Sequence, residues 1–272
     1  MIKRILGSWF RFGCITPSVP IATAPIDAKK IRMLTPGPTV AFINQSTVVT
    51  DAQLIPMVAA LQIQVDRDFS PAWKIDANLV FVPKGKVVDP NAWIIYIMDT
   101  SDQSGALGYH DLTPAGMPVA KVFAKDDLDN KLSVSVTLSH ELLEMLVDPY
   151  IQNCVFDQTS DTEGTLYAYE VCDAPEDDKF GYLINGVLVS DFVFPTWFES
   201  GRSPNSVRFD FKNVLKAPFS LAPGGYIGMF VVGPNSTGWS QKTAEGPTGQ
   251  RHLAKLARGI SRFHKRKNKG SK

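Results

Sequence analysis

The middle of the chain contains the stretch Ser139-His140-Glu141-Leu142-Leu143-Glu144. It belongs to a longer run, residues 132–147, whose composition predicts a helix. Asp148-Pro149 ends that helix, because proline cannot continue a helix and restricts the residue before it. Residues four apart project from the same side of a helix, so His140 and Glu144 can hold one metal ion between them. The stretch therefore predicts a metal-binding helix.

Glu141 directly follows the histidine, and its carboxylate can reach a water molecule at that ion and act as its general base. This is the arrangement of His-Glu-x-x-His peptidases, with Glu144 in the place of the second histidine. A carboxylate is a harder and negatively charged ligand, so the exchange should make the bound water less acidic. We therefore expect the exchange to weaken catalysis more than metal binding.

A solvated helix face is the alternative interpretation of these three polar residues, because so short a pattern also occurs by chance. The neighbouring residues favour burial, since the helix is apolar nearly all around. A buried histidine and two buried glutamates need partners or a metal ion. The apolar residues are Leu138, Leu142, Leu143, Met145, Leu146 and Val147.

The segments before this helix predict the order strand, helix, strand, strand, strand. The strands are expected at residues 39–43, 77–82, 92–97 and 118–123, which are short, β-branched or aromatic runs. A helix capped by Thr50-Asp51 is expected from about Ala52 to Asp66, because apolar residues recur there on one helical face. From residue 150 onward the chain is rich in turns, with strands expected at 181–184, 187–194 and 226–232.

Four motifs together resemble a zincin-like group of phage and bacterial proteins with a Ser-His-Glu-x-x-Glu-x-x-x-Asp-Pro helix. They are residues 139–149, 107–111, 167–173 and 189–198. The resemblance covers roughly residues 39–235 and implies a zinc metallopeptidase that binds one Zn²⁺. It implies an α+β fold: a zincin-like mixed sheet with a backing helix and an active-site helix, then a loop- and strand-rich C-terminal half. In such folds the last strand of the sheet, here expected at 118–123, forms the upper wall of the substrate cleft.

A zinc site needs at least a third protein ligand. Glu170 and Asp173 resemble the downstream Glu-x-x-x-Asp element of gluzincins, in which Glu is the third ligand and Asp orients a first ligand, although the spacing is one residue shorter. We expect Glu170 as ligand, with Asp173 or Asp148 in support. Asp148 lies about 12 Å beyond His140 along a regular helix, so it reaches the metal only if the following turn folds back. Cys172 is a reserve ligand, and an exposed acidic loop is the alternative.

The run Gly108-Tyr109-His110-Asp111 precedes the expected cleft wall. Tyr109 or His110 there could face the substrate and stabilise a developing oxyanion. The alternative is a polar histidine on a surface loop.

Composition favours a globular protein rather than a disordered or fibrous one, with 44% hydrophobic residues among 272 and a formal charge of +1. Three cysteines imply no disulfide framework. We expect an irregular N-terminal arm (1–38), one zincin-like domain (39–235) and a basic C-terminal tail (236–272). The apolar run near the start is too short for a convincing signal peptide, and none approaches the ~20 residues of a membrane span, so we expect a soluble protein.

The tail could contact nucleic acid or an anionic membrane through a cluster of basic residues, or could simply be solvated. These residues are Arg258, Arg262, Lys265, Arg266 and Lys267. Three functions are therefore in competition: a zinc-dependent peptidase with unknown peptide or protein substrate, a non-catalytic structural protein on the same scaffold, and a nucleic-acid-associated protein. Together with the resemblance to phage proteins, the structural and the nucleic-acid-associated functions suit a component of a virion. We would then expect the protein in the virion or in the host cytoplasm.

Overall fold

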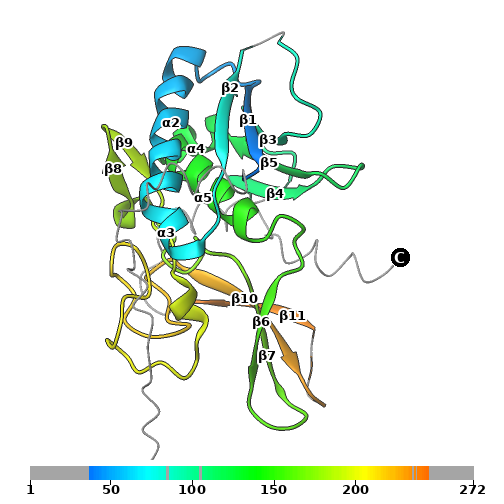
Figure 1. The fold of residues 1–272 in the computed structure, drawn as a ribbon, viewed down its shortest axis with the longest axis vertical. Helices are drawn as coiled ribbons and strands as arrows, with labels where there is room; N and C mark the ends of the chain where they lie inside the picture. The colour runs from blue at the N-terminus through cyan, green and yellow to red at the C-terminus, as the bar shows by residue number, and fades with distance from the viewer. Residues whose placement is uncertain (1–36, 84–85, 104–105, 235, 237, 245–272) are drawn as a thin grey trace, which may run out of the picture. The chain divides into compact units, whose positions relative to one another are not determined.

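Five strands form one mixed sheet in the order β2-β1-β3-β5-β4 (Figure 1). β2, β1, β3 and β5 pair in parallel, whereas β4 lies at the edge and runs antiparallel to β5. The computed structural model describes residues 37–83, 86–103, 106–234, 236 and 238–244. The strands are β1 (Thr39–Asn44), β2 (Asn78–Val82), β3 (Trp93–Met98), β4 (Gly108–Leu112) and β5 (Pro118–Phe123).

The four strands predicted from sequence in this region are confirmed, but the edge strand β4 was not predicted. Residues 118–123 are the last strand of this sheet in chain order, but they do not form its edge. That segment is β5, which lies between β3 and β4, and the edge position belongs to β4. His110, which we considered as a loop residue, pairs with Ala120 inside the sheet.

The first helix, α2 (Asp51–Ile63), begins at the predicted cap. Thr50 and Gln53 form a reciprocal capping box there. The predicted end near Asp66 is wrong, because the chain continues as a π-helix, Gln64–Phe69, and then as α3 (Ser70–Trp73). The wider π-helical turns bury both Gln64 and Asp68.

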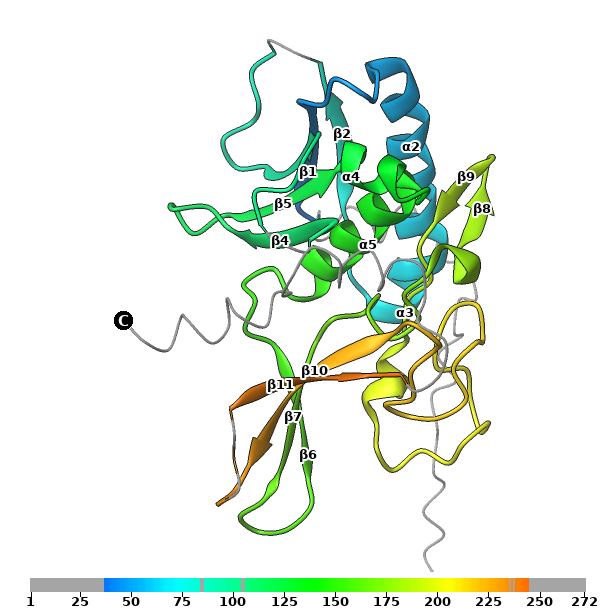
Figure 2. The same ribbon diagram turned by 180° about the vertical axis from the view of Figure 1, so that it is seen from behind.

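Every residue of α5 (Val134–Val147) is buried, which confirms the burial predicted for this helix. It follows the short helix α4 (Ala124–Asp129) and contacts β4, β5 and β9 (Val187–Val189). In both views of the molecule α5 lies between β4 and the β8–β9 hairpin (Figures 1 and 2). The polar residues of this helix are therefore enclosed by protein.

The C-terminal half contains a four-stranded antiparallel sheet, β11-β10-β7-β6, and the hairpin of β8 and β9. Residues 226–232 form the predicted strand β10, whereas β6, β7 and β11 were not predicted. Of the strand expected at 187–194, only the first three residues form a strand, β9. Because β11 pairs with β10, the folded sheet continues beyond residue 235, where we expected the tail to begin. The remaining bounds are β6 (Cys154–Gln158), β7 (Gly164–Ala168), β8 (Tyr182–Ile184), β10 (Tyr226–Val232), β11 (Trp239–Thr243) and two 3₁₀ turns, Asp178–Phe180 and Pro195–Phe198.

The protein is α+β, with several sheets and few helices. One large apolar core joins these elements. The core includes Phe42 of β1, Leu61 of α2, Leu142 of α5, and Trp197 and Ile227 of the C-terminal half. None of the helices in the described ranges is long and apolar enough to cross a membrane.

Candidate metal centre

The centre is built where α5 meets β4 and the loop at residues 169–173. Helical spacing places His140 and Glu144 one turn apart on α5, and β4 contributes His110. The loop contributes Glu170 and Asp173, and all five residues expose 5% or less of their surface. Three segments far apart in sequence thus bury a cluster of ionisable side chains.

His140 lies between two carboxylates. Its Nε2 is 3.2 Å from Oε1 of Glu144 and 3.2 Å from Oδ1 of Asp173. Within the described part of the chain, neither Nε2 of His140 nor Oδ1 of Asp173 is aligned for a hydrogen bond. Two ligands of a tetrahedral zinc ion are about 3.3–3.6 Å apart when each bond is ~2.0–2.2 Å. At 3.2 Å the two contacts are close to this range and are also ordinary ion-pair distances, so a metal ion could take the place of the proton that His140 shares with the two carboxylates.

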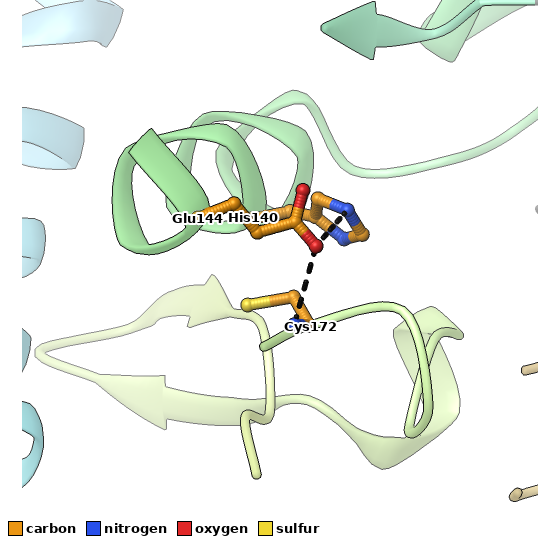
Figure 3. A group of neighbouring side chains, drawn as sticks. All are labelled: His140, Glu144 and Cys172. Atoms are coloured by element: carbon orange, nitrogen blue, oxygen red, sulfur yellow. Dashed lines mark hydrogen bonds and ion pairs between the residues drawn. The ribbon is translucent and has the colours of Figure 1, made fainter. Parts of the chain in front are cut away.

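The backbone of the loop holds Glu144. The Cys172 amide donates a hydrogen bond of 3.3 Å to Oε1 of Glu144, and Figure 3 shows the carboxylate between this nitrogen and the imidazole of His140. His140, Glu144 and Cys172 each offer one ligand atom, and these three atoms lie within 4.8 Å of one another. Nitrogen, oxygen and sulfur donors of this kind suit Zn²⁺.

β4 contributes His110 to the centre. Its Nδ1 is 3.7 Å from Oε2 of Glu141 and 3.9 Å from Oε2 of Glu144, and its Nε2 is 3.8 Å from Oε2 of Glu170. His110, Glu144 and Glu170 form a second group of possible ligands within 4.8 Å of one another. The structure thus brings together His110, Glu144 and Glu170, the residue expected as third ligand.

The burial and charges of the centre alter two pKa values. Burial lowers the pKa of His140, but the charge of Glu144 and the contact with Asp173 outweigh it and raise this pKa to about 10. Burial and the Glu144 charge raise the pKa of the Cys172 thiol well above its usual value. In the metal-free protein His140 is therefore protonated and Cys172 neutral, and a metal ion that binds both displaces two protons.

Two further predicted residues have other partners. The hydroxyl of Tyr109 donates to Asp102, with oxygen distances of 2.9 and 3.0 Å, and neighbours on a strand point to opposite faces, so Tyr109 points away from the side of His110. Oδ1 of Asp148 accepts hydrogen bonds from the amides of Gln152 and Asn153, which fixes the turn after α5. Neither group of possible metal ligands among the described residues includes Asp148.

The basic residues predicted to contact nucleic acid or a membrane lie outside the described residues. They are Arg258, Arg262, Lys265, Arg266 and Lys267.

Charge makes this centre suitable for cations. Glu141, Glu144, Glu170 and Asp173 bring up to four negative charges together, whereas His110 and His140 supply at most two positive ones. Burial strengthens the repulsion between like charges, and a multivalent cation lowers it. The residues present therefore fit the metal ion that the sequence resemblance implies.

Sequence reasoning did not anticipate that His110 lies beside Glu144 and Glu170, because it placed His110 in a loop. These residues instead form an antiparallel edge strand. Side chains alternate between the two faces of a strand, and that of His110 lies on the face toward α5. No protein-family model, curated protein or solved structure matches this chain, so a function has to be argued from the geometry of the centre itself.

Proposed function

We propose that the protein is a metal-dependent hydrolase of peptide bonds on a zincin-like scaffold. The observation that carries the proposal is the buried group of His140, Glu144 and Cys172, whose ligand atoms lie within 4.8 Å of one another, with Asp173 3.2 Å from His140. His140 and Glu144 hold the ion, and Cys172 or Asp173 completes its ligands. The peptide bond as substrate rests on the resemblance of the Ser-His-Glu-x-x-Glu helix.

A bound Zn²⁺ supplies Lewis acidity, which polarises a carbonyl and acidifies water. Glu141 takes the proton from the attacking water and passes it to the leaving amine. Its carboxylate is held close to β4, where it packs against Gly108 and lies 3.7 Å from Nδ1 of His110. With only 2% of its surface exposed, Glu141 is shielded from bulk water.

The test is Glu141→Gln in the full chain, with metal content and cleavage of a mixed peptide library measured together. We expect metal to be retained and the cleavage rate to fall about 10²–10⁴-fold, because the base is lost while the ligands stay. The matched control is Glu163→Gln, the same change on the exposed turn between β6 and β7. Absence of metal from the wild-type protein as well as the variant would remove the proposal.

A second function is a purely structural metal site, and the number of donors favours it. If Cys172 and Asp173 both bind the ion with His140 and Glu144, four protein ligands leave no open position, which is the arrangement of structural zinc. Wild-type protein that contains metal, melts at a lower temperature after chelation and cleaves none of the peptides would select this function.

A further inference from the structure

We propose that this centre is built for two divalent metal ions, with Glu144 as the carboxylate that bridges them. The inference rests on the proposed function, because it deepens the description of the same centre. The first ion lies with His140, Glu144, Cys172 and Asp173. The second lies with His110, Glu144 and Glu170, next to Glu141.

The two oxygens of Glu144 face different histidines. Oε1 is 3.2 Å from Nε2 of His140, whereas Oε2 is 3.9 Å from Nδ1 of His110. A carboxylate that bridges two ions directs one oxygen to each of them, and here an imidazole is available as a further ligand near each oxygen. Bridged pairs of ions about 3.5–4 Å apart are common in hydrolytic metalloenzymes. The position of Glu144 between the histidines therefore matches a bridge.

The two groups of ligands differ in donor type. The first combines imidazole, carboxylate and a thiol that becomes a good ligand once deprotonated, and this set suits Zn²⁺. The second combines one imidazole with the carboxylates of Glu144 and Glu170, a harder set that also accepts Mn²⁺ or Fe²⁺. One ligand atom from each of His110, Glu144 and Glu170 lies within 4.8 Å of the other two, so side-chain movements of about 1 Å bring them to the edge length of a tetrahedral zinc site.

The number of donors assigns different roles to the two ions. Each position has three possible ligands, and Asp173 beside His140 offers a fourth only to the first, which is the number found in structural zinc sites. The base proposed from sequence, Glu141, lies beside the second group, with its Oε2 3.7 Å from Nδ1 of His110. The first ion thus fixes α5 to the loop at 169–173, and Glu141 acts as general base beside the second.

Charge supports two cations more than one. The carboxylates of Glu141, Glu144, Glu170 and Asp173 carry up to four negative charges, and a metal-bound Cys172 thiolate adds a fifth; two divalent ions offset four of the five and one offsets two. Buried like charges are costly unless they are compensated.

The experiment measures metal stoichiometry in the full-length protein after stripping with chelator, reloading with Mn²⁺ or Zn²⁺ and desalting. We expect about two ions per chain in the wild type, as in other two-metal sites, and loss of one of them in Glu170→Gln. Glu163→Gln repeats the same chemical change on an exposed turn and should keep both ions. Electron paramagnetic resonance of the Mn²⁺-loaded wild type needs no variant, and it should give the spectrum of a spin-coupled pair.

Each outcome decides one claim. A single ion in the wild type with the spectrum of an isolated Mn²⁺ overturns the two-ion centre and leaves the proposed hydrolase standing. Two ions retained in folded Glu170→Gln overturn the assignment of Glu170 to the second position. No bound metal in the wild type overturns the inference and the proposed function together.

Discussion

The side chain of Glu141 occupies space that is free only because residue 108 of β4 is glycine. A Cβ built on Gly108 would lie 2.8 Å from Cγ and 2.8 Å from Oε1 of Glu141, and also 2.8 Å from Cγ2 of Thr137. Real Cβ atoms do not approach other atoms so closely, so β4 can pack on α5 at this point only with glycine. The glycine is therefore a positioning residue for the proposed base.

We expect Gly108→Ala to displace Glu141 and to destabilise the protein by about 1–3 kcal/mol, the usual range for overpacking in a tight core. Cleavage should fall more than metal content, since the ligands on the other side of Glu144 are not touched. The comparison is Gly201→Ala, where nothing lies within 4 Å of the added Cβ. Equal stability and activity of the two variants in urea denaturation and peptidase assays would contradict this role of Gly108.

At the scale of elements, the π-helix Gln64–Phe69 and α5 are joined by a buried hydrogen-bond network. Ser139, next to His140, donates to Oε1 of Gln64 at 2.7 Å. Nε2 of Gln64 donates to the hydroxyl of Tyr182 at 3.1 Å and to the carbonyl of Ser190 at 2.9 Å. The network fixes the rotation of α5 about its axis, and so the direction of His140 and Glu144.

Gln64→Leu should cost about 1–3 kcal/mol, because it leaves buried hydrogen-bonding groups of Ser139, Tyr182 and Ser190 without this partner. Since α5 loses its anchor, metal affinity should fall as well. Gln152→Leu makes the same change at an exposed position and should alter neither property. A double-mutant cycle with Ser139→Ala measures the coupling, and additive effects would show that the two side chains do not act together.

The elements also explain which parts of the structure could be predicted. The helix α5 and the parallel strands follow from local signals, such as the apolar residues around Leu142 and the β-branched run of β3. The strand β4 has no such signal, because Gly108, His110 and Asp111 have low strand propensity and the strand depends on its pairing with β5. The position of His110 in the centre depends on that long-range pairing, and so sequence reasoning placed His110 in a loop.

The loop of Glu170 and Asp173 illustrates the same limit for the centre itself. From the sequence this segment was either a source of metal ligands or an exposed acidic loop, and the exposed loop is wrong, because Glu170, Cys172 and Asp173 are all buried. The sequence could not assign each of them to a histidine, because this depends on how the loop meets α5. The structure puts Asp173 beside His140 and Glu170 beside His110.

At the scale of the whole molecule, the centre connects the first half of the chain to the second. β4 and α5 belong to the part built on the five-stranded sheet, while Glu170, Cys172 and Asp173 lie in the loop that follows β7 of the four-stranded sheet. The amide of Val193 also bonds to the carbonyl of Val171, which ties this loop to the segment after β9. Metal ions bound at the centre would therefore hold together segments that are far apart along the chain.

Removal of metal should consequently lower the stability of the whole protein. A ligand present at about 1,000 times its dissociation constant stabilises the folded state by roughly 4 kcal/mol, which corresponds to a melting temperature shift on the order of ten degrees. Calorimetry of the wild type before and after treatment with a chelator measures the shift, and added Zn²⁺ should restore it. In Glu144→Gln, which removes the carboxylate shared by both ligand groups, the chelator should change the melting temperature little. A wild type that loses its metal but keeps its melting temperature would mean that the ions do not connect the two halves.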